Sequence, residues 1–133
     1  EINMFNEKNN GQTILSLIKK KFIISAHDVS LGGILVAVAK MCIKSRKGFE
    51  IKKPKQLINQ FEYLFAEDQG RYIIEIERNN YKQVKEILEK NSVHFDELGI
   101  VLEKDIVLDK KTKVSIDDLI QSNNNWLKKY MEA

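Results

Sequence analysis

Two short runs of residues hold the side chains in this chain that are best suited to chemistry. The first run is His27-Asp28-Val29-Ser30-Leu31-Gly32-Gly33, between apolar stretches at 22–26 and 34–43. This order predicts a strand, a tight turn and the start of a helix. Backbone N–H groups at a helix start are unpaired, and Gly32 and Gly33 would let a phosphate approach the main chain. The run therefore predicts an anion site or, alternatively, close packing of helix on strand.

The second run is Leu64-Phe65-Ala66-Glu67-Asp68-Gln69-Gly70-Arg71-Tyr72, which sets four polar side chains beside one glycine at a strand entrance. Glu67 or Asp68 could accept bonds from ribose hydroxyls, and Gln69 could bond an amide. Arg71 could pair with a phosphate or with an acidic neighbour. The alternative is a turn held by an internal pair between an acid and an arginine.

General-base catalysis by His27 with Asp28 is disfavoured, because adjacent residues of an extended segment point to opposite faces. No serine or cysteine nucleophile with a recognisable elbow accompanies them. A structural His27, an Asp28 that bonds the turn, and Ser30 as a helix N-cap are favoured. We predict no catalytic and no metal-binding residue here. The candidates to lie near a ligand are Asp28, Ser30, Gly32, Gly33, Glu67, Asp68, Gln69 and Arg71.

Hydrophobic spacing predicts alternating helices and strands in the first half of the chain. The expected order is a helix that starts after the breaker Asn9-Asn10-Gly11, a strand at 22–25, a helix at about 31–45, a strand at 49–52 and a helix at 56–65. Leu57, Phe61 and Leu64 should face inward from the last of these helices.

The second half continues the alternation. A strand is expected at 71–77, with Tyr72, Ile74 and Ile76 on one face. Asn80 with Gln83 resembles a capping box, and it precedes a helix with the apolar stripe Tyr81, Val84, Ile87 and Leu88. Strands at 98–102 and 106–108 would form a hairpin around Lys104-Asp105, and a terminal helix would open at Ser115. These elements predict an α+β fold, a mixed β-sheet covered by helices, with a partly ferredoxin-like topology.

Length and composition narrow the classes of function. The 133 residues suit one compact domain, and the formal charge of +3 is a mild excess spread along the chain. With only three arginines, nucleic-acid binding is not expected. Cys42 lies in an apolar run and is predicted to be buried, and neither a signal peptide nor a membrane span is apparent. We therefore expect a cytoplasmic protein that binds neither nucleic acid nor membrane.

Together the two runs resemble those of the C-terminal domain of the AIR synthase superfamily, whose usual text is near HDVSDGGL followed by LFxExQGR. Within it, the sequence most resembles the last domain of the phosphoribosylformylglycinamidine (FGAM) synthase subunit II family. The ending supports this, since Ser115-Ile116-Asp117-Asp118-Leu119 precedes Trp126-Leu127 and Tyr130-Met131. One departure is Leu31, where the family usually has an acidic residue.

The resemblance implies part of an ATP-dependent C–N ligase of purine biosynthesis, which needs Mg²⁺. That enzyme converts formylglycinamide ribonucleotide and glutamine-derived ammonia to formylglycinamidine ribonucleotide. Its active site would lie mainly in N-terminal domains, so this chain alone should be inactive and bind no cofactor. The expected partners are the rest of its own chain, a glutaminase subunit and a small third subunit. The Glu67 segment would face a pseudo-symmetric nucleotide site, which favours a structural role over substrate contact.

The start at Glu1 fits a fragment of a longer chain, and we expect residues 1–133 to be one such domain. One alternative is the same domain of another superfamily member. The other is a freestanding α+β ligand-binding or interaction module, and a large exposed apolar face would count against it.

Overall fold

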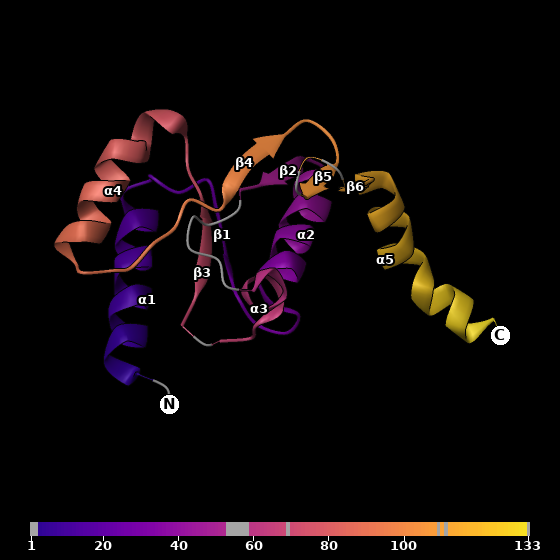
Figure 1. The fold of residues 1–133 in the computed structure, drawn as a ribbon, viewed down its shortest axis with the longest axis horizontal. Helices are drawn as coiled ribbons and strands as arrows, with labels where there is room; N and C mark the ends of the chain where they lie inside the picture. The colour runs from indigo at the N-terminus through magenta and orange to yellow at the C-terminus, as the bar shows by residue number, and fades with distance from the viewer. Residues whose placement is uncertain (1–2, 53–58, 69, 109, 111, 133) are drawn as a thin grey trace. The chain divides into compact units, whose positions relative to one another are not determined.

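The computed structural model describes residues 3–52, 59–68, 70–108, 110 and 112–132. The chain forms two compact units (Figure 1). The first comprises Glu1–Ala37 with Asn59–Asp96, and the second comprises Val38–Ile58 with Glu97–Ala133. Helix α2 (Gly33–Ser45) contributes residues to both, and it buries Cys42 as predicted.

The first unit is built on a pair of antiparallel strands, β1 and β3. Ser25 lies opposite Glu75, and Asp28 lies opposite Tyr72. The strand β1 therefore includes His27 and Asp28, three residues further along than the predicted strand at 22–25. The elements of this unit are α1 (Met4–Lys19), β1 (Ser25–Asp28), the start of α2, α3 (Gln60–Phe65), β3 (Tyr72–Glu75), the 3-10 helix η1 (Arg78–Asn80) and α4 (Tyr81–Lys90).

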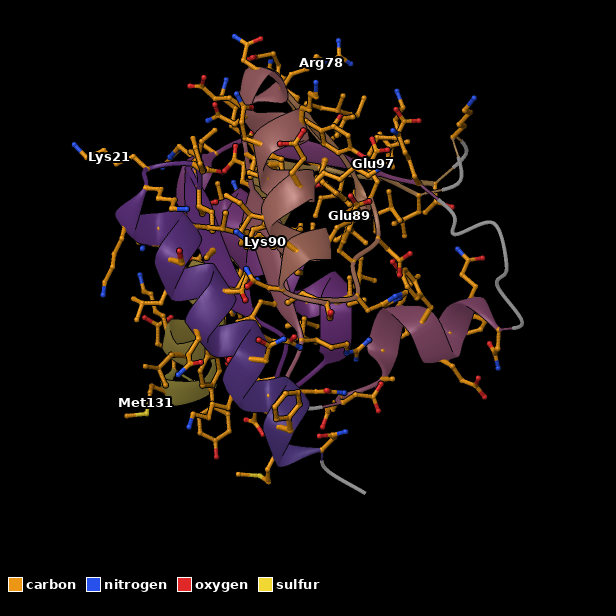
Figure 2. The ribbon with its side chains drawn as sticks, turned by 90° about the vertical axis from the view of Figure 1, so that its left-hand side faces the viewer. Lys21, Arg78, Glu89, Lys90, Glu97 and Met131 are labelled. Atoms are coloured by element: carbon orange, nitrogen blue, oxygen red, sulfur yellow. The ribbon has the colours of Figure 1, made fainter. Side chains whose placement is uncertain are left out.

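The core of this unit lies where α1 meets α4. Leu17 of α1 packs with Val84 and Leu88 of α4, and Ile74 and Ile76 pack against this cluster. The stripe predicted for α4 is thus confirmed at its centre. Asn80, however, makes no side-chain capping bond, so the predicted capping box is wrong. Figure 2 shows α1 and α4 side by side, with exposed charged side chains such as those of Glu89 and Lys90 on the outer surface of α4.

Helix α1 begins earlier than expected, at Met4, where the Asn3 side chain accepts bonds from two backbone N–H groups. The predicted breaker at 9–11 lies inside the helix. Its asparagine amides bond elsewhere: Asn9 Nδ2 donates to Asn91 O at 2.8 Å and Asn10 Nδ2 donates to Gly70 O at 3.1 Å. Because these side chains bond distant carbonyls, they do not compete for the backbone of their own helix.

Helix α3 is short, and it begins after the cap residue Asn59. Leu64 is buried, but Phe61 is 75% exposed and stacks on Phe65 with ring centroids 6.3 Å apart. The inward prediction for Phe61 is wrong, because a helix of six residues turns few positions toward one neighbour. Residues 56–58, including Leu57, lie outside the described residues.

The second unit contains a four-stranded sheet in the order β4-β2-β5-β6. Strand β2 pairs antiparallel with β4 and parallel with β5, so the sheet is mixed, as predicted. Sequence analysis missed the last strand, which pairs with β5. The elements are β2 (Gly48–Ile51), β4 (Gly99–Leu102), β5 (Ile106–Leu108), β6 (Thr112–Val114) and α5 (Ile116–Met131), together with the rest of α2.

The predicted hairpin between β4 and β5 is wrong, because β2 lies between them. The turn at Lys104-Asp105 bonds β2 instead, since Phe49 N–H donates to Asp105 O at 2.9 Å. A Cβ on Gly48 would lie 2.2 Å from Asp105 O, so a side chain there would collide with this turn. The lack of a side chain at Gly48 thus allows β2 to enter between the two strands.

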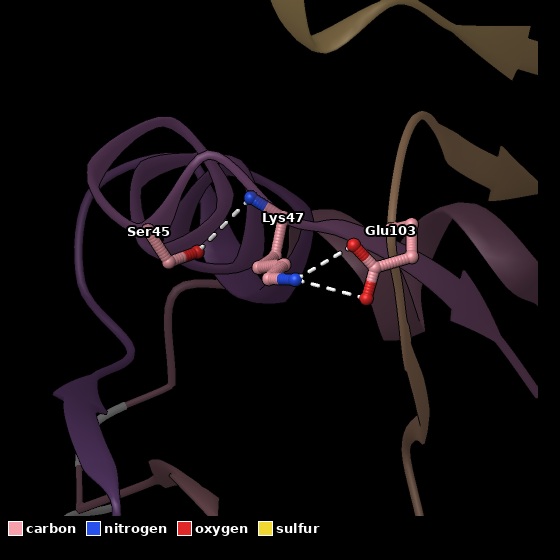
Figure 3. Close-up of polar contacts among 3 residues, drawn as sticks. All are labelled: Ser45, Lys47 and Glu103. Atoms are coloured by element: carbon pink, nitrogen blue, oxygen red, sulfur yellow. Dashed lines mark hydrogen bonds and ion pairs between the residues drawn. The ribbon is translucent and has the colours of Figure 1, made fainter.

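An ion pair joins the start of β2 to the end of β4 (Figure 3). Lys47 Nζ lies 2.9 and 2.8 Å from the two carboxylate oxygens of Glu103, and Ser45 Oγ accepts from Lys47 N–H at 3.3 Å. The hydrogen bond from Lys47, and then its charge, lower the pKa of Glu103 below the ordinary glutamate value.

We expect Lys47→Met to raise the pKa of Glu103 to that of an ordinary exposed glutamate, as measured by NMR titration. Because the folded pKa is depressed, the pair stabilises the fold above the unfolded pKa. That stabilisation is lost as pH falls through the folded pKa. Lys52→Met is the matched control, since Lys52 pairs with Glu97 instead. An unchanged Glu103 pKa in Lys47→Met would contradict the assignment.

We expect Gly11→Ala to stabilise the chain by roughly 0.5–1 kcal/mol, because alanine favours a helix interior. The added Cβ would meet only Tyr72 Oη, at 3.6 Å. Gly48→Ala should destabilise, because its Cβ would collide with backbone. Chemical denaturation of both variants measures the difference, and a destabilised Gly11→Ala would show that the contact at Tyr72 is tighter than the geometry indicates.

Candidate functional site

The two sequence runs meet at one end of the β1–β3 pair in the first unit. Asp28 lies opposite Tyr72, and just beyond the strand Val29 N–H donates to Arg71 O at 2.9 Å. Val29 is buried beneath this end. The pairing therefore places the turn before α2 beside the turn before β3.

A carboxylate of the second run occupies the anion position of the first. Glu67 Oε1 accepts a hydrogen bond from Gly32 N–H at 2.7 Å, just before the start of α2. Backbone N–H groups there carry partial positive charge, which favours a negative partner. The anion at this helix start is thus a side chain of the protein itself.

The second glycine is required by close packing. Gly33 has φ +69°, and a Cβ there would lie 2.6 Å from Phe65 C and 2.7 Å from Leu64 O. The C-terminal end of α3 therefore packs directly on the main chain at Gly33. This supports the alternative that the glycines serve close packing. The element packed against Gly33 is the end of α3, whereas the sequence had suggested a strand.

Arg71 holds the turn between α3 and β3. Its Nη2 donates to Ala66 O, the first carbonyl after α3, and lies 3.4 Å from Asp68 Oδ2. Both partners belong to the same turn. The arrangement matches the alternative of an internal acid–arginine pair, and Gln69 lies outside the described residues.

His27 and Asp28 start from opposite faces of β1, since His27 is half-buried and Asp28 is exposed. The His27 ring nevertheless turns toward its neighbour: Nδ1 lies 2.6 Å from Asp28 O and 3.5 Å from Asp28 Oδ1. The shorter contact is to the backbone, which fits a structural His27.

The turn before α2 is exposed at Ser30 and Leu31. The helix starts at Gly33, two residues later than predicted. Ser30 O accepts the Gly33 N–H at 3.0 Å, while Leu31 is largely exposed to solvent. Both residues are accessible beside the Glu67 carboxylate.

Two further polar groups were missed by sequence analysis. Ser25 Oγ donates to Glu75 Oε2 at 2.7 Å across the strand pair, on the face that His27 shares. Tyr63 of α3 has a pKa raised by burial and by the Asp96 charge, with Arg71 acting in the opposite direction. Ser25 and Glu75 are 50 residues apart in the sequence, so no local pattern indicates that they meet.

The described residues include no group of three His, Cys, Asp or Glu side chains placed to hold a metal ion. Among the described helices, none has the length and apolar character to cross a membrane.

Known proteins share both the fold and the sequence pattern. The family model "AIR synthase related protein, C-terminal domain" matches residues 2–110. The chain belongs to this family. The match spans both units and both sequence runs, and α5 lies beyond it. The family resemblance inferred from the two runs is confirmed.

Two relatives in this family match almost the whole chain. It is 67% identical over 132 residues to phosphoribosylformylglycinamidine synthase subunit PurL of Pelagibacter ubique, covering 99% of this chain and 18% of that protein. It is 38% identical over 125 residues to the subunit of the same name from Bartonella bacilliformis, covering 94% of this chain and 17% of that protein. The chain therefore spans about a fifth of the length of these relatives.

Solved structures show the same fold. Thermotoga maritima PurL complexed with FGAR superposes with a TM-score of 0.76 at 20% identity, covering 90% of this chain and 21% of that one. The PurLQS structure from the same organism superposes with a TM-score of 0.73 at 20% identity, and the match covers 86% of this chain and 21% of that one. The predicted α+β fold of the AIR synthase C-terminal type is confirmed.

We expect Glu67→Ala to destabilise the chain by about 1 kcal/mol, because the Gly32 N–H loses a charged acceptor at an exposed site. Glu67→Gln keeps an acceptor and should cost less, about 0.3–1 kcal/mol from the lost charge at the helix start. Denaturant titration measures both. Glu86→Ala, an exposed change beyond the first turn of α4, is the control, and equal stability of all three variants would remove the structural role of Glu67.

Proposed function

We propose that this chain is the C-terminal domain of an FGAM synthase subunit II, and that residues 1–133 form one domain of a longer polypeptide. The observation that carries the proposal is the 67% identity to a PurL subunit along 99% of the chain. Identity at this level over the whole domain supports the same parent enzyme. The parent would be a cytoplasmic, ATP- and Mg²⁺-dependent ligase of purine biosynthesis that converts formylglycinamide ribonucleotide to formylglycinamidine ribonucleotide.

The geometry supports a structural part for this domain within that enzyme. The Gly32 N–H, which a phosphate at this helix start would need as a donor, already donates to the Glu67 carboxylate. Arg71 bonds Ala66 O and pairs with Asp68 within its own turn. The described residues also do not fit a magnesium site, since they hold no cluster of ligating side chains. Nucleotide, metal and the reacting groups would therefore be held mainly by the remaining four-fifths of the parent.

The exposed polar groups at this end remain candidates to border a ligand. Asp28, Ser30 and Asp68 are exposed at the same end of the β1–β3 pair. We propose that they line the edge of a cleft in the parent enzyme, with no part in the chemical step. A glutaminase subunit and a small third subunit would be partners of the parent, in keeping with the PurLQS assembly of the Thermotoga protein.

The test is an ammonia- and ATP-dependent assay of formylglycinamidine ribonucleotide formation. We expect the longer polypeptide that contains this sequence to be active and the 133-residue chain alone to be inactive. Asp68→Ala in the active protein should alter KM more than kcat if Asp68 borders the ligand. A longer polypeptide that folds but does not form the product would overturn the proposed function, as would activity of the isolated chain.

A further inference from the structure

The C-terminal part of α5 lies in solvent without a covering surface in its own unit. Ile116, the first residue of the helix, is buried, whereas every residue from 121 to 132 is exposed. Figure 1 shows α5 extending away from the sheet of its unit. A helical segment of this length is marginal in water unless an apolar face is packed.

This exposed segment carries an apolar stripe. Trp126, Leu127, Tyr130 and Met131 recur at helical spacings of three and four, and they are 61, 53, 74 and 76% exposed. Polar residues, including Asn125 and Lys128, occupy the other side. Such a stripe is the form in which a helix enters an apolar groove.

We propose that this stripe docks into an apolar groove on the part of the same polypeptide that lies outside residues 1–133. The proposal rests on the proposed function insofar as it requires a longer parent chain. The relatives supply that length, since the chain matches 18% of the Pelagibacter protein, including α5. The family model ends at residue 110, so the helical arm formed by residues 121–132 lies beyond the matched domain, whereas the match to the Pelagibacter protein includes it.

The area of the apolar stripe favours a groove on the same polypeptide over a groove on a separate protein. The two aromatic side chains, with Leu127 and Met131, offer roughly 600 Å² of apolar surface on the arm. A stable interface between separate proteins buries about 800 Å² on each partner. A tethered surface binds at high effective concentration and tolerates the smaller area. The groove should also present acceptors at its rim, because the Trp126 indole N–H and the Tyr130 hydroxyl need partners once buried.

Hydrogen–deuterium exchange of the full-length protein, purified without other subunits, tests this inference. We expect the amides of residues 121–131 to exchange far more slowly than in an unstructured peptide, equally at low and high protein concentration. The double variant Trp126→Ala/Tyr130→Ala should lower that protection by at least roughly tenfold. Asn125→Ala, on the polar side of α5, is the matched control, and unchanged protection in α4 shows that the variant is folded.

Three results would overturn the proposal: no protection of the arm in the full-length protein, protection only at concentrations where the protein dimerises, or protection only after the glutaminase subunit is added. The activity assay on the same sample separates the two ideas. If the enzyme is active but the amides of the arm exchange rapidly, the docking proposal is rejected and the proposed function stands. If those amides are protected but the protein is inactive, the proposed function is rejected and the docking stands.

Discussion

The antiparallel pairing of β1 with β3 is the constraint on which the first unit depends. It joins segments more than forty residues apart, with Ser25 opposite Glu75 and Asp28 opposite Tyr72. This register brings the turn at Gly32 within reach of Glu67, and it presents Ile74 to the core between α1 and α4. Local order at both turns is therefore a consequence of one long-range contact.

The side chains of the second turn supply partners for backbone groups at two helix ends. Glu67 accepts the Gly32 N–H at the start of α2, and Arg71 donates to the carbonyl of Ala66 after α3. Helix ends leave such groups without a partner inside the helix, and a hydrogen bond to each of them stabilises the helix end. Residues that could grip a phosphate are thus used to close the fold, which explains why a ligand-binding pattern can serve a structural purpose.

The second unit shows how a glycine can decide topology. Local spacing of β4 and β5 around Lys104-Asp105 indicates a hairpin, yet β2 enters between them because Gly48 allows its backbone to contact the turn. The Lys47–Glu103 pair then links β2 to β4 at the surface. A mixed sheet results from strands that each look ordinary in sequence.

By itself the sequence determined the α+β class, the helical face of Val84 and Leu88, and the family, because these depend on periodicity and local motifs. Tertiary structure alone decided three things: that Glu67 fills the anion position at Gly32, that Asn9 and Asn10 lie inside α1, and that Ser25 meets Glu75. In each case the partner lies 35 or more residues away. Side chains with several possible partners acquire one only when the strands align, and no local pattern records that choice.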